Sequence, residues 1–156
     1  MNQTRRNVLK ASGGVGVLAF LAGAGFVVPN VAHAADWNKV AFDGRTVQDA
    51  FKALGAASPE NSNDIILKAP DIAENGTVVP VGVESKIDGT ESIAVLIEKN
   101  PNPLAAVFDI PAGTEQGVTT RVKMAETSNV YALVKANGKY FVTKKEIKVT
   151  LGGCGG

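Results

Sequence analysis

Histidine and cysteine are nearly absent from this 156-residue chain, which holds one of each, His33 and Cys154. His33 lies in an N-terminal stretch that we expect to be removed, so the remaining chain has no histidine. This excludes catalytic pairing of serine or cysteine with histidine, and zinc sites that need imidazole. A lone cysteine also excludes an internal disulfide. Few enzyme mechanisms survive these losses, which favours a protein that is not an enzyme.

An apolar run long enough to cross a bilayer is also missing. The most apolar segment, residues 15–28, spans about 14 residues, whereas a spanning helix needs about 20. Arg5 and Arg6 precede it in a pattern typical of twin-arginine (Tat) signals, and Ala32-His33-Ala34 follows as a small-x-small cleavage site. We therefore expect residues 1–34 to be a cleaved signal for folded export to the periplasm. The alternative is an uncleaved membrane anchor.

Clustered basic residues are scarce once this signal is set aside. From residue 35 onward the chain has 13 Lys and Arg against 15 Asp and Glu, a net charge of −2. Lys144-Lys145 is the one adjacent basic pair that remains. Nucleic-acid binding usually needs a clustered basic face, so the composition argues against it. The mature length, about 120 residues, suits a single domain with a modest core.

One helix is predicted near the start of the mature chain, over residues 46–54. Asp43 or Thr46 is placed to cap its N-terminus, and Gly55 to end it. Apolar side chains recur there at helical spacing and fall on one face, at Val47, Ala50, Phe51 and Leu54.

The chain from there to residue 151 shows the alternation and the turn residues of short strands. Pro80 favours an edge or a bulge for its strand, and Asn137-Gly138 predicts a hairpin. We predict about seven strands and therefore an all-β fold, an immunoglobulin-like β-sandwich over residues 35–151, with a small closed barrel as the alternative. The strand-like segments are residues 65–67, 77–85, 92–98, 104–110, 119–125, 130–134, 140–143 and 147–151.

The sequence ends in Gly152-Gly153-Cys154-Gly155-Gly156. Because glycine loses the most backbone freedom on ordering, we expect residues 152–156 to form a mobile arm. At about 3.3 Å per residue, the arm would carry the Cys154 thiol roughly 10 Å beyond the sheet. A thiol flanked by glycines suits a carrier whose cargo enters narrow active sites. A free thiol with a pKa of about 8.5 is partly ionised at neutral pH, so the partner enzymes would activate it.

Other interpretations of this tail remain open. Cys154 is an inert tail residue in one, and forms an intermolecular disulfide in another. Prenylation needs a cysteine fourth from the end, whereas Cys154 is third. The terminal Gly155-Gly156 also matches ubiquitin-like sulfur carriers, although those proteins place a helix between pairs of strands. A structural β-sandwich, from a different class, would not need the tail.

Together, several segments resemble SoxY, the family of sulfur carrier subunits of the thiosulfate-oxidising Sox system. The first is the terminal Gly-Gly-Cys-Gly-Gly. The others are residues 70–76 followed by 79–81, residues 98–103 and residues 120–128. The resemblance covers nearly all of the mature chain, and the twin-arginine signal agrees with it.

This resemblance implies a periplasmic carrier, not an enzyme, that needs no cofactor and binds sulfur covalently at Cys154. Gly152, Gly153, Gly155 and Gly156 would form the swinging arm. The implied partners are a SoxZ-like small subunit in a heterodimer, a c-type cytochrome enzyme that conjugates thiosulfate, a hydrolase that releases sulfate and, in some organisms, a sulfane dehydrogenase. The chain itself would hold no catalytic residue and no metal. It would bind no nucleic acid and, after signal cleavage, no membrane.

Overall fold

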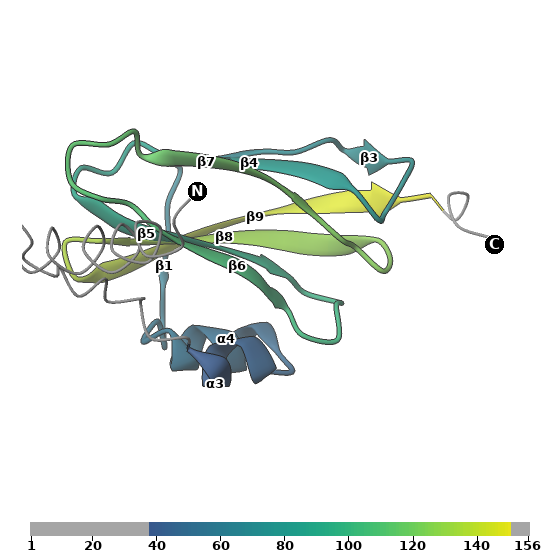
Figure 1. The fold of residues 1–156 in the computed structure, drawn as a ribbon, viewed down its shortest axis with the longest axis horizontal. Coiled ribbons are helices and arrows are strands. Elements are labelled where there is room, and N and C mark those ends of the chain that lie inside the picture. The colour runs from purple at the N-terminus through teal and green to yellow at the C-terminus, as the bar shows by residue number, and fades with distance from the viewer. Residues whose placement is uncertain (1–37, 151–156) are drawn as a thin grey trace, which may run out of the picture. The chain divides into compact units, whose positions relative to one another are not determined.

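The computed structural model describes residues 38–150, which fold into two β-sheets and two short helices (Figure 1). The larger sheet has the strand order β1-β9-β8-β5-β6, and β3 also pairs with β9. Its strands are β1 (Glu60–Asn61), β3 (Ile72–Ala73), β5 (Thr90–Ile97), β6 (Leu104–Asp109), β8 (Ser128–Ala136) and β9 (Lys139–Val149). The smaller sheet, β2-β4-β7, comprises β2 (Ile65–Lys68), β4 (Val79–Ser85) and β7 (Gly117–Val122). The predicted all-β sandwich is confirmed.

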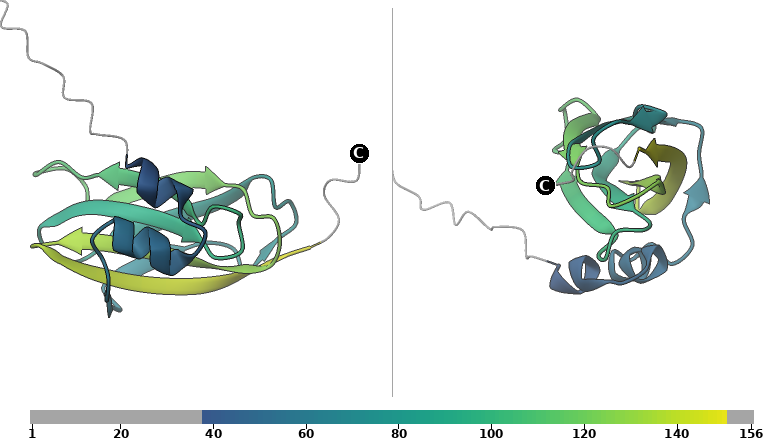
Figure 2. Two further views of the ribbon diagram at one scale, coloured as in Figure 1. Left: turned by 90° about the horizontal axis from the view of Figure 1, so that it is seen from below. Right: turned by 90° about the vertical axis from the view of Figure 1, so that its right-hand side faces the viewer.

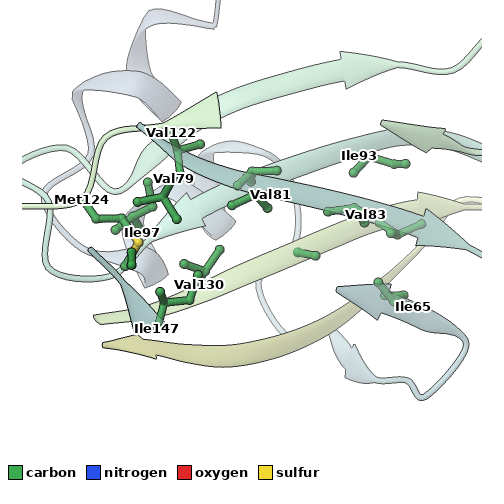
Figure 3. Packing of buried hydrophobic residues seen from close by; sticks show 14 of the residues in the cluster. Ile65, Val79, Val81, Val83, Ile93, Ile97, Val122, Met124, Val130 and Ile147 are labelled. Carbon is green, nitrogen blue, oxygen red and sulfur yellow. The ribbon is translucent and has the colours of Figure 1, made fainter. Parts of the chain in front are cut away.

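The main core fills the space between the two sheets. Val79, Val81 and Val83 alternate along β4 and point from the small sheet toward β5, β8 and β9 (Figure 3). Ile93, Val95 and Ile97 of β5 are each at most 1% exposed and meet them from the larger sheet, as their alternation predicts. Burial of such side chains contributes about 1.5–3 kcal/mol each, so this cluster is the main source of stability.

A second core lies on the outer face of the larger sheet, under the helices. Helix α4 (Val47–Ala53) buries Val47, Ala50 and Phe51 against Leu96 of β5 and Leu133 of β8. Figure 2 shows the helices on one side of the strands. Because β5 is buried on both faces from Ile93 to Ile97, Ala94 and Leu96 on the outer face are apolar as well as the alternating residues of the inner face.

The ends of helix α4 follow from local chemistry that the sequence displays. Thr46 is the N-cap, and its hydroxyl accepts a hydrogen bond from the Asp49 N–H at 3.1 Å. At the other end Gly55 takes a φ of +84°, a conformation that favours glycine. The structure also contains a helix that was not predicted, α3 (Lys39–Asp43), which Asn38 caps in the same way. None of the helices within residues 38–150 has the length and apolarity to cross a membrane.

The sequence predicts two separate strands over residues 140–143 and 147–151, whereas the structure has one long strand, β9. It runs without a break from Lys139 to Val149, because β8 pairs with it at every position from Ala136↔Lys139 to Ser128↔Ile147. The two strands are joined by the predicted hairpin, in which Asn137 and Gly138 have φ of 51° and 72°.

The proline of β4 lies at a local edge. The strand as a whole is central in the small sheet, contrary to a simple edge assignment. However, β2 pairs with it only from Gly82 to Ser85, so at Pro80 the neighbouring strand is β7 alone. A proline, which has no N–H to donate, is tolerated at such a position.

Candidate functional site

The residues predicted to carry the function lie outside the part of the chain that the structure describes. These are Cys154 and the glycines at 152, 153, 155 and 156, and the predicted signal, residues 1–34, lies outside it as well. What the structure does describe is the strand that leads to them, β9, as far as Thr150. The described residues nearest in sequence to Cys154 are those at the end of this strand.

Three loops and the end of β9 meet at one end of the sandwich, which we call the C-terminal rim. The rim consists of residues 74–78, 98–103, 123–127 and 148–150. At this end of the core, Figure 3 shows Met124, Val79, Ile97 and Ile147 gathered together. Much of the sequence that resembles the SoxY family, over residues 70–76, 98–103 and 120–128, is thus brought to the strand end that precedes Cys154.

Side-chain hydrogen bonds to backbone groups join the loops of the rim. Asn100 donates from Nδ2 to the Lys123 carbonyl at 2.7 Å and accepts from the Ala125 N–H at 3.2 Å. The Ser128 hydroxyl accepts from the Lys99 N–H at 3.0 Å, which ties the turn after β5 to the start of β8. Because both the NH₂ and the carbonyl oxygen of its side-chain amide are hydrogen-bonded, Asn100 fixes the relative position of two loops that are distant in sequence.

At Gly76 the backbone of one rim loop comes close to Met124 of another. The Gly76 carbonyl accepts from the Met124 N–H at 2.7 Å. A Cβ at this position would lie 2.5 Å from the Met124 carbonyl oxygen and 2.9 Å from Val149 Cγ1. Glycine is therefore required here so that the loop can pack against both the neighbouring loop and β9.

The last residues of β9 bond to groups on both sides. Toward β3, the Lys148 N–H donates to the Asp71 carbonyl at 2.9 Å and the Thr150 N–H to the Ala73 carbonyl at 3.1 Å. Toward the rim, the Val149 N–H donates to the hydroxyl of Thr127 at 3.0 Å. The chain is thus held by specific hydrogen bonds up to the residue after β9.

A lysine on the inner face of β9 attaches the preceding segment of the chain. Lys145 donates from Nζ to the Ala69 carbonyl at 2.6 Å and forms an ion pair with Asp71 at 2.9 Å. The hydrogen bond and the charge of Lys145 lower the pKa of the Asp71 carboxyl below its usual 3.8. This lysine therefore holds the connection between β2 and β3 beside β9.

A polar cluster covers the outer face of the larger sheet near the rim. Asn129 donates to Glu98 at 2.7 Å, the Tyr131 hydroxyl lies 3.4 Å from the same carboxylate, and the Lys144 ammonium lies 5.8 Å from the centre of the Tyr131 ring. Burial, and secondly the Glu98 charge, raise the pKa of Tyr131, so its hydroxyl is protonated at neutral pH. The cluster is a network of satisfied polar contacts, and it presents no activated nucleophile.

Within residues 38–150 there is no group of three or more Cys, Asp, Glu or His side chains placed to hold a metal ion. Sequence reasoning missed the contributions of Thr127, Gly76 and Lys145. Thr127 and Gly76 stand in stretches that resemble the family, but the sequence gives no sign of what they contact. Lys145 reads as a solvated strand lysine.

Comparison with known proteins identifies the family. Residues 50–154 match the family described as "Sulfur oxidation protein SoxY". Among solved structures, the sulfur carrier protein SoxY from Chlorobium limicola f thiosulfatophilum is 37% identical, with a TM-score of 0.62 over 68% of this chain and 97% of that one. No curated protein matches the sequence.

A superoxide reductase (neelaredoxin) from Ignicoccus hospitalis shares the fold. It is 18% identical, with a TM-score of 0.50 over 56% of this chain and 81% of that one. At that identity the likeness concerns the fold alone. The match over residues 50–154 includes Cys154, and with the 37% identity to a sulfur carrier it shows that this chain belongs to the SoxY family of sulfur oxidation proteins.

Proposed function

We propose that this protein is the periplasmic sulfur carrier of thiosulfate oxidation and that it holds its cargo covalently on the thiol of Cys154. The chain does no chemistry of its own and presents the thiol to partner enzymes. The observation that carries the proposal is the position of the single cysteine. It lies four residues beyond Thr150, the last residue with described backbone hydrogen bonds, in a stretch that is otherwise Leu151 and glycine.

The rim supports this proposal because its contacts hold the end of β9, the strand that precedes the reactive group in the sequence. Asn100, Gly76 and Thr127 fix the surroundings of β9 by contacts that involve no titrating group. Tyr131, a partly buried ionisable group near the rim, is hydrogen-bonded and protonated. We expect the partner enzymes to supply the general base that activates the thiol, as carrier function requires.

The proposed cycle starts with conjugation of thiosulfate. The Cys154 sulfur bonds to the outer sulfur of thiosulfate, one proton and two electrons leave, and the product is the anion Cys–S–S–SO₃⁻. The electrons pass to the haem groups of a c-type cytochrome partner. A hydrolase then adds water at the sulfonate sulfur, which releases sulfate and a proton and leaves a persulfide, Cys–S–SH. In organisms with a sulfane dehydrogenase, that enzyme oxidises the remaining sulfur.

The proposal includes the assembly and location that the family resemblance suggested. The carrier pairs with a SoxZ-like small subunit as a heterodimer and is exported by the twin-arginine route. That route carries folded proteins, so a subunit without its own signal can leave with its partner. No cofactor is needed, because the carrier stores sulfur on its own side chain.

The first test is mass spectrometry of the protein purified from its host while the cells oxidise thiosulfate. We expect the peptide that contains Cys154 to carry added sulfur atoms or a thiosulfonate group, and a reductant to remove them. The same spectrum shows whether the chain begins at Ala35. In parallel, Cys154→Ser is expected to fold and to bind its small subunit normally and to abolish thiosulfate oxidation, since a serine oxygen cannot form the disulfide-like bond.

The outcomes separate this proposal from its alternatives. A bare thiol in actively oxidising cells, or a fully active serine variant, contradicts the carrier function. An adduct on the carboxylate of Gly156 in place of Cys154 would support a ubiquitin-like diglycine carrier. Full activity after deletion of residues 152–156 would support a structural β-sandwich.

A further inference from the structure

The end of β9 extends beyond the strand that supports it. Strand β8 begins at Ser128, which pairs with Ile147. The next three residues, Lys148 to Thr150, therefore have no β8 residue opposite them. Their position must therefore be set by other groups.

Two groups hold these three residues, one on each side of the end of β9. On one side the two-residue strand β3 pairs in parallel with Lys148 and Val149, and its Ala73 carbonyl accepts from the Thr150 N–H. On the other side the Thr127 hydroxyl accepts from the Val149 N–H at 3.0 Å, in the place where a β8 carbonyl would stand if that strand continued. A side chain thus completes the hydrogen bonding of a strand whose neighbour has ended.

Thr127 can perform this task because its loop is held in place. The loop is fixed by Asn100, which bonds to Lys123 and Ala125, and by the Met124 N–H, which donates to the Gly76 carbonyl. Its hydroxyl is thus offered at a defined point, half-buried against β9. By contrast, a threonine in a free loop would have to be ordered when it binds, at a cost in conformational entropy.

We propose that Thr127 is a positioning residue that sets Thr150 as the point from which the carrier arm starts. The inference rests on the function proposed above. When Val149 is held, Cys154 lies four positions beyond Thr150, a reach of about 14 Å at full extension. If the strand were released back to Ile147, Cys154 would lie seven positions beyond the last held residue, a reach of about 24 Å.

The difference in reach affects the encounter with partner enzymes. The volume open to the thiol grows roughly as the 3/2 power of the arm's length, so lengthening the arm from four residues to seven would enlarge that volume about twofold. The concentration of the thiol at a docked partner's active site falls accordingly. We therefore expect Thr127 to act on the delivery of the thiol and to leave its intrinsic reactivity unchanged.

The test is Thr127→Val, which removes the hydroxyl and keeps the branched shape. The first readout, on the full mature chain, is amide hydrogen exchange. We expect the Lys148, Val149 and Thr150 amides to exchange about fivefold faster or more, because a lost hydrogen bond changes the opening equilibrium by that amount. Exchange over residues 128–147 is expected to stay as in the wild type.

The second readout is delivery to the partner enzymes. Thiosulfate-dependent reduction of the partner cytochrome is expected to fall in kcat/KM for the carrier, by up to about twofold, while alkylation of Cys154 by iodoacetamide keeps its wild-type rate. Thr127→Ser, which retains the hydroxyl, should restore both measurements. Thr119→Val, the same change at an exposed position of β7 in the other sheet, is the matched control and should alter neither.

Two outcomes would overturn the inference while the proposed function stands. In the first, only the Val149 amide exchanges faster, which makes Thr127 a local cap. In the second, all three amides exchange faster but delivery to the cytochrome is unchanged. A wild-type thiol that never carries sulfur would remove the proposed function and this inference together, whereas the exchange results would still describe the fold.

Discussion

The lack of a side chain at Gly76 allows the loops of the C-terminal rim to pack closely. A methyl group there would meet the Met124 carbonyl oxygen at 2.5 Å, and that oxygen belongs to backbone that is itself hydrogen-bonded to the same loop. We therefore predict that Gly76→Ala destabilises the domain by about 1–3 kcal/mol, the usual cost of a forced backbone shift. Urea unfolding followed by circular dichroism measures this change.

A second glycine supplies the control for that prediction. Gly82, in β4, has extended backbone, and a Cβ there would lie 3.4 Å from Lys68 Cβ, which is ordinary contact. Gly82→Ala should leave stability unchanged or raise it slightly, since alanine restricts the unfolded chain. Equal losses in the two variants would show that contacts in the rim are not the cause.

At the level of residues, the sequence predicted groups that act on their own neighbours. Thr46 caps helix α4 and Asn137-Gly138 forms the hairpin as expected, because each motif is complete within a few residues. Thr127 and Lys145 were not found, since their partners, Val149 and Asp71, are separated from them by 22 and 74 residues. Only the folded chain shows such contacts.

Among the elements, β3 is too short to be stable alone, so its position depends on contacts with neighbouring residues. It has two residues, and the ion pair between Lys145 and Asp71 holds the segment that leads into it. We predict that Asp71→Asn lowers stability slightly at neutral pH, because the aspartate is largely exposed and such pairs contribute little. Thermal unfolding across a pH series measures the difference.

The pH dependence of this difference has a definite sign. Lys145 lowers the pKa of Asp71 in the folded state below 3.8, so the contribution of the pair is complete above pH 3.8. It is lost as the pH falls through the lowered folded-state pKa, where wild type and Asp71→Asn should converge. Asp109→Asn removes an exposed charge of β6 elsewhere and serves as the control. A wild-type advantage that grows in acid would contradict the assignment.

Strands with a clear pattern were predicted, and strands without one were not. Strands β4, β5, β6 and β7 follow from alternation and turn residues, and helix α4 follows from its apolar face. Strands β1 and β3 have two residues each and pair in parallel with β9, so no local periodicity marks them. The continuity of β9 also escaped prediction, because residues 144–146, Lys-Lys-Glu, interrupt its apolar alternation although β8 pairs with all of them.

For the whole molecule, folding and the proposed carriage of sulfur depend on different parts of the chain. The two hydrophobic clusters draw on residues between Ala41 and Val149. The predicted carrier group lies beyond them, at Cys154, so the family identity of the domain could be inferred from sequence and confirmed by comparison.

Deletion of residues 152–156 tests this separation directly. The deletion removes four glycines and Cys154 and leaves every residue of both hydrophobic clusters in place. We predict that the midpoint of thermal unfolding changes by less than about 2 °C, a small fraction of what a lost core contact costs a domain of this size. Thiosulfate oxidation is expected to be lost, as in Cys154→Ser, and the small subunit should still co-purify. A large fall in the midpoint would make the tail part of the folded domain, and loss of co-purification would place it in the subunit interface.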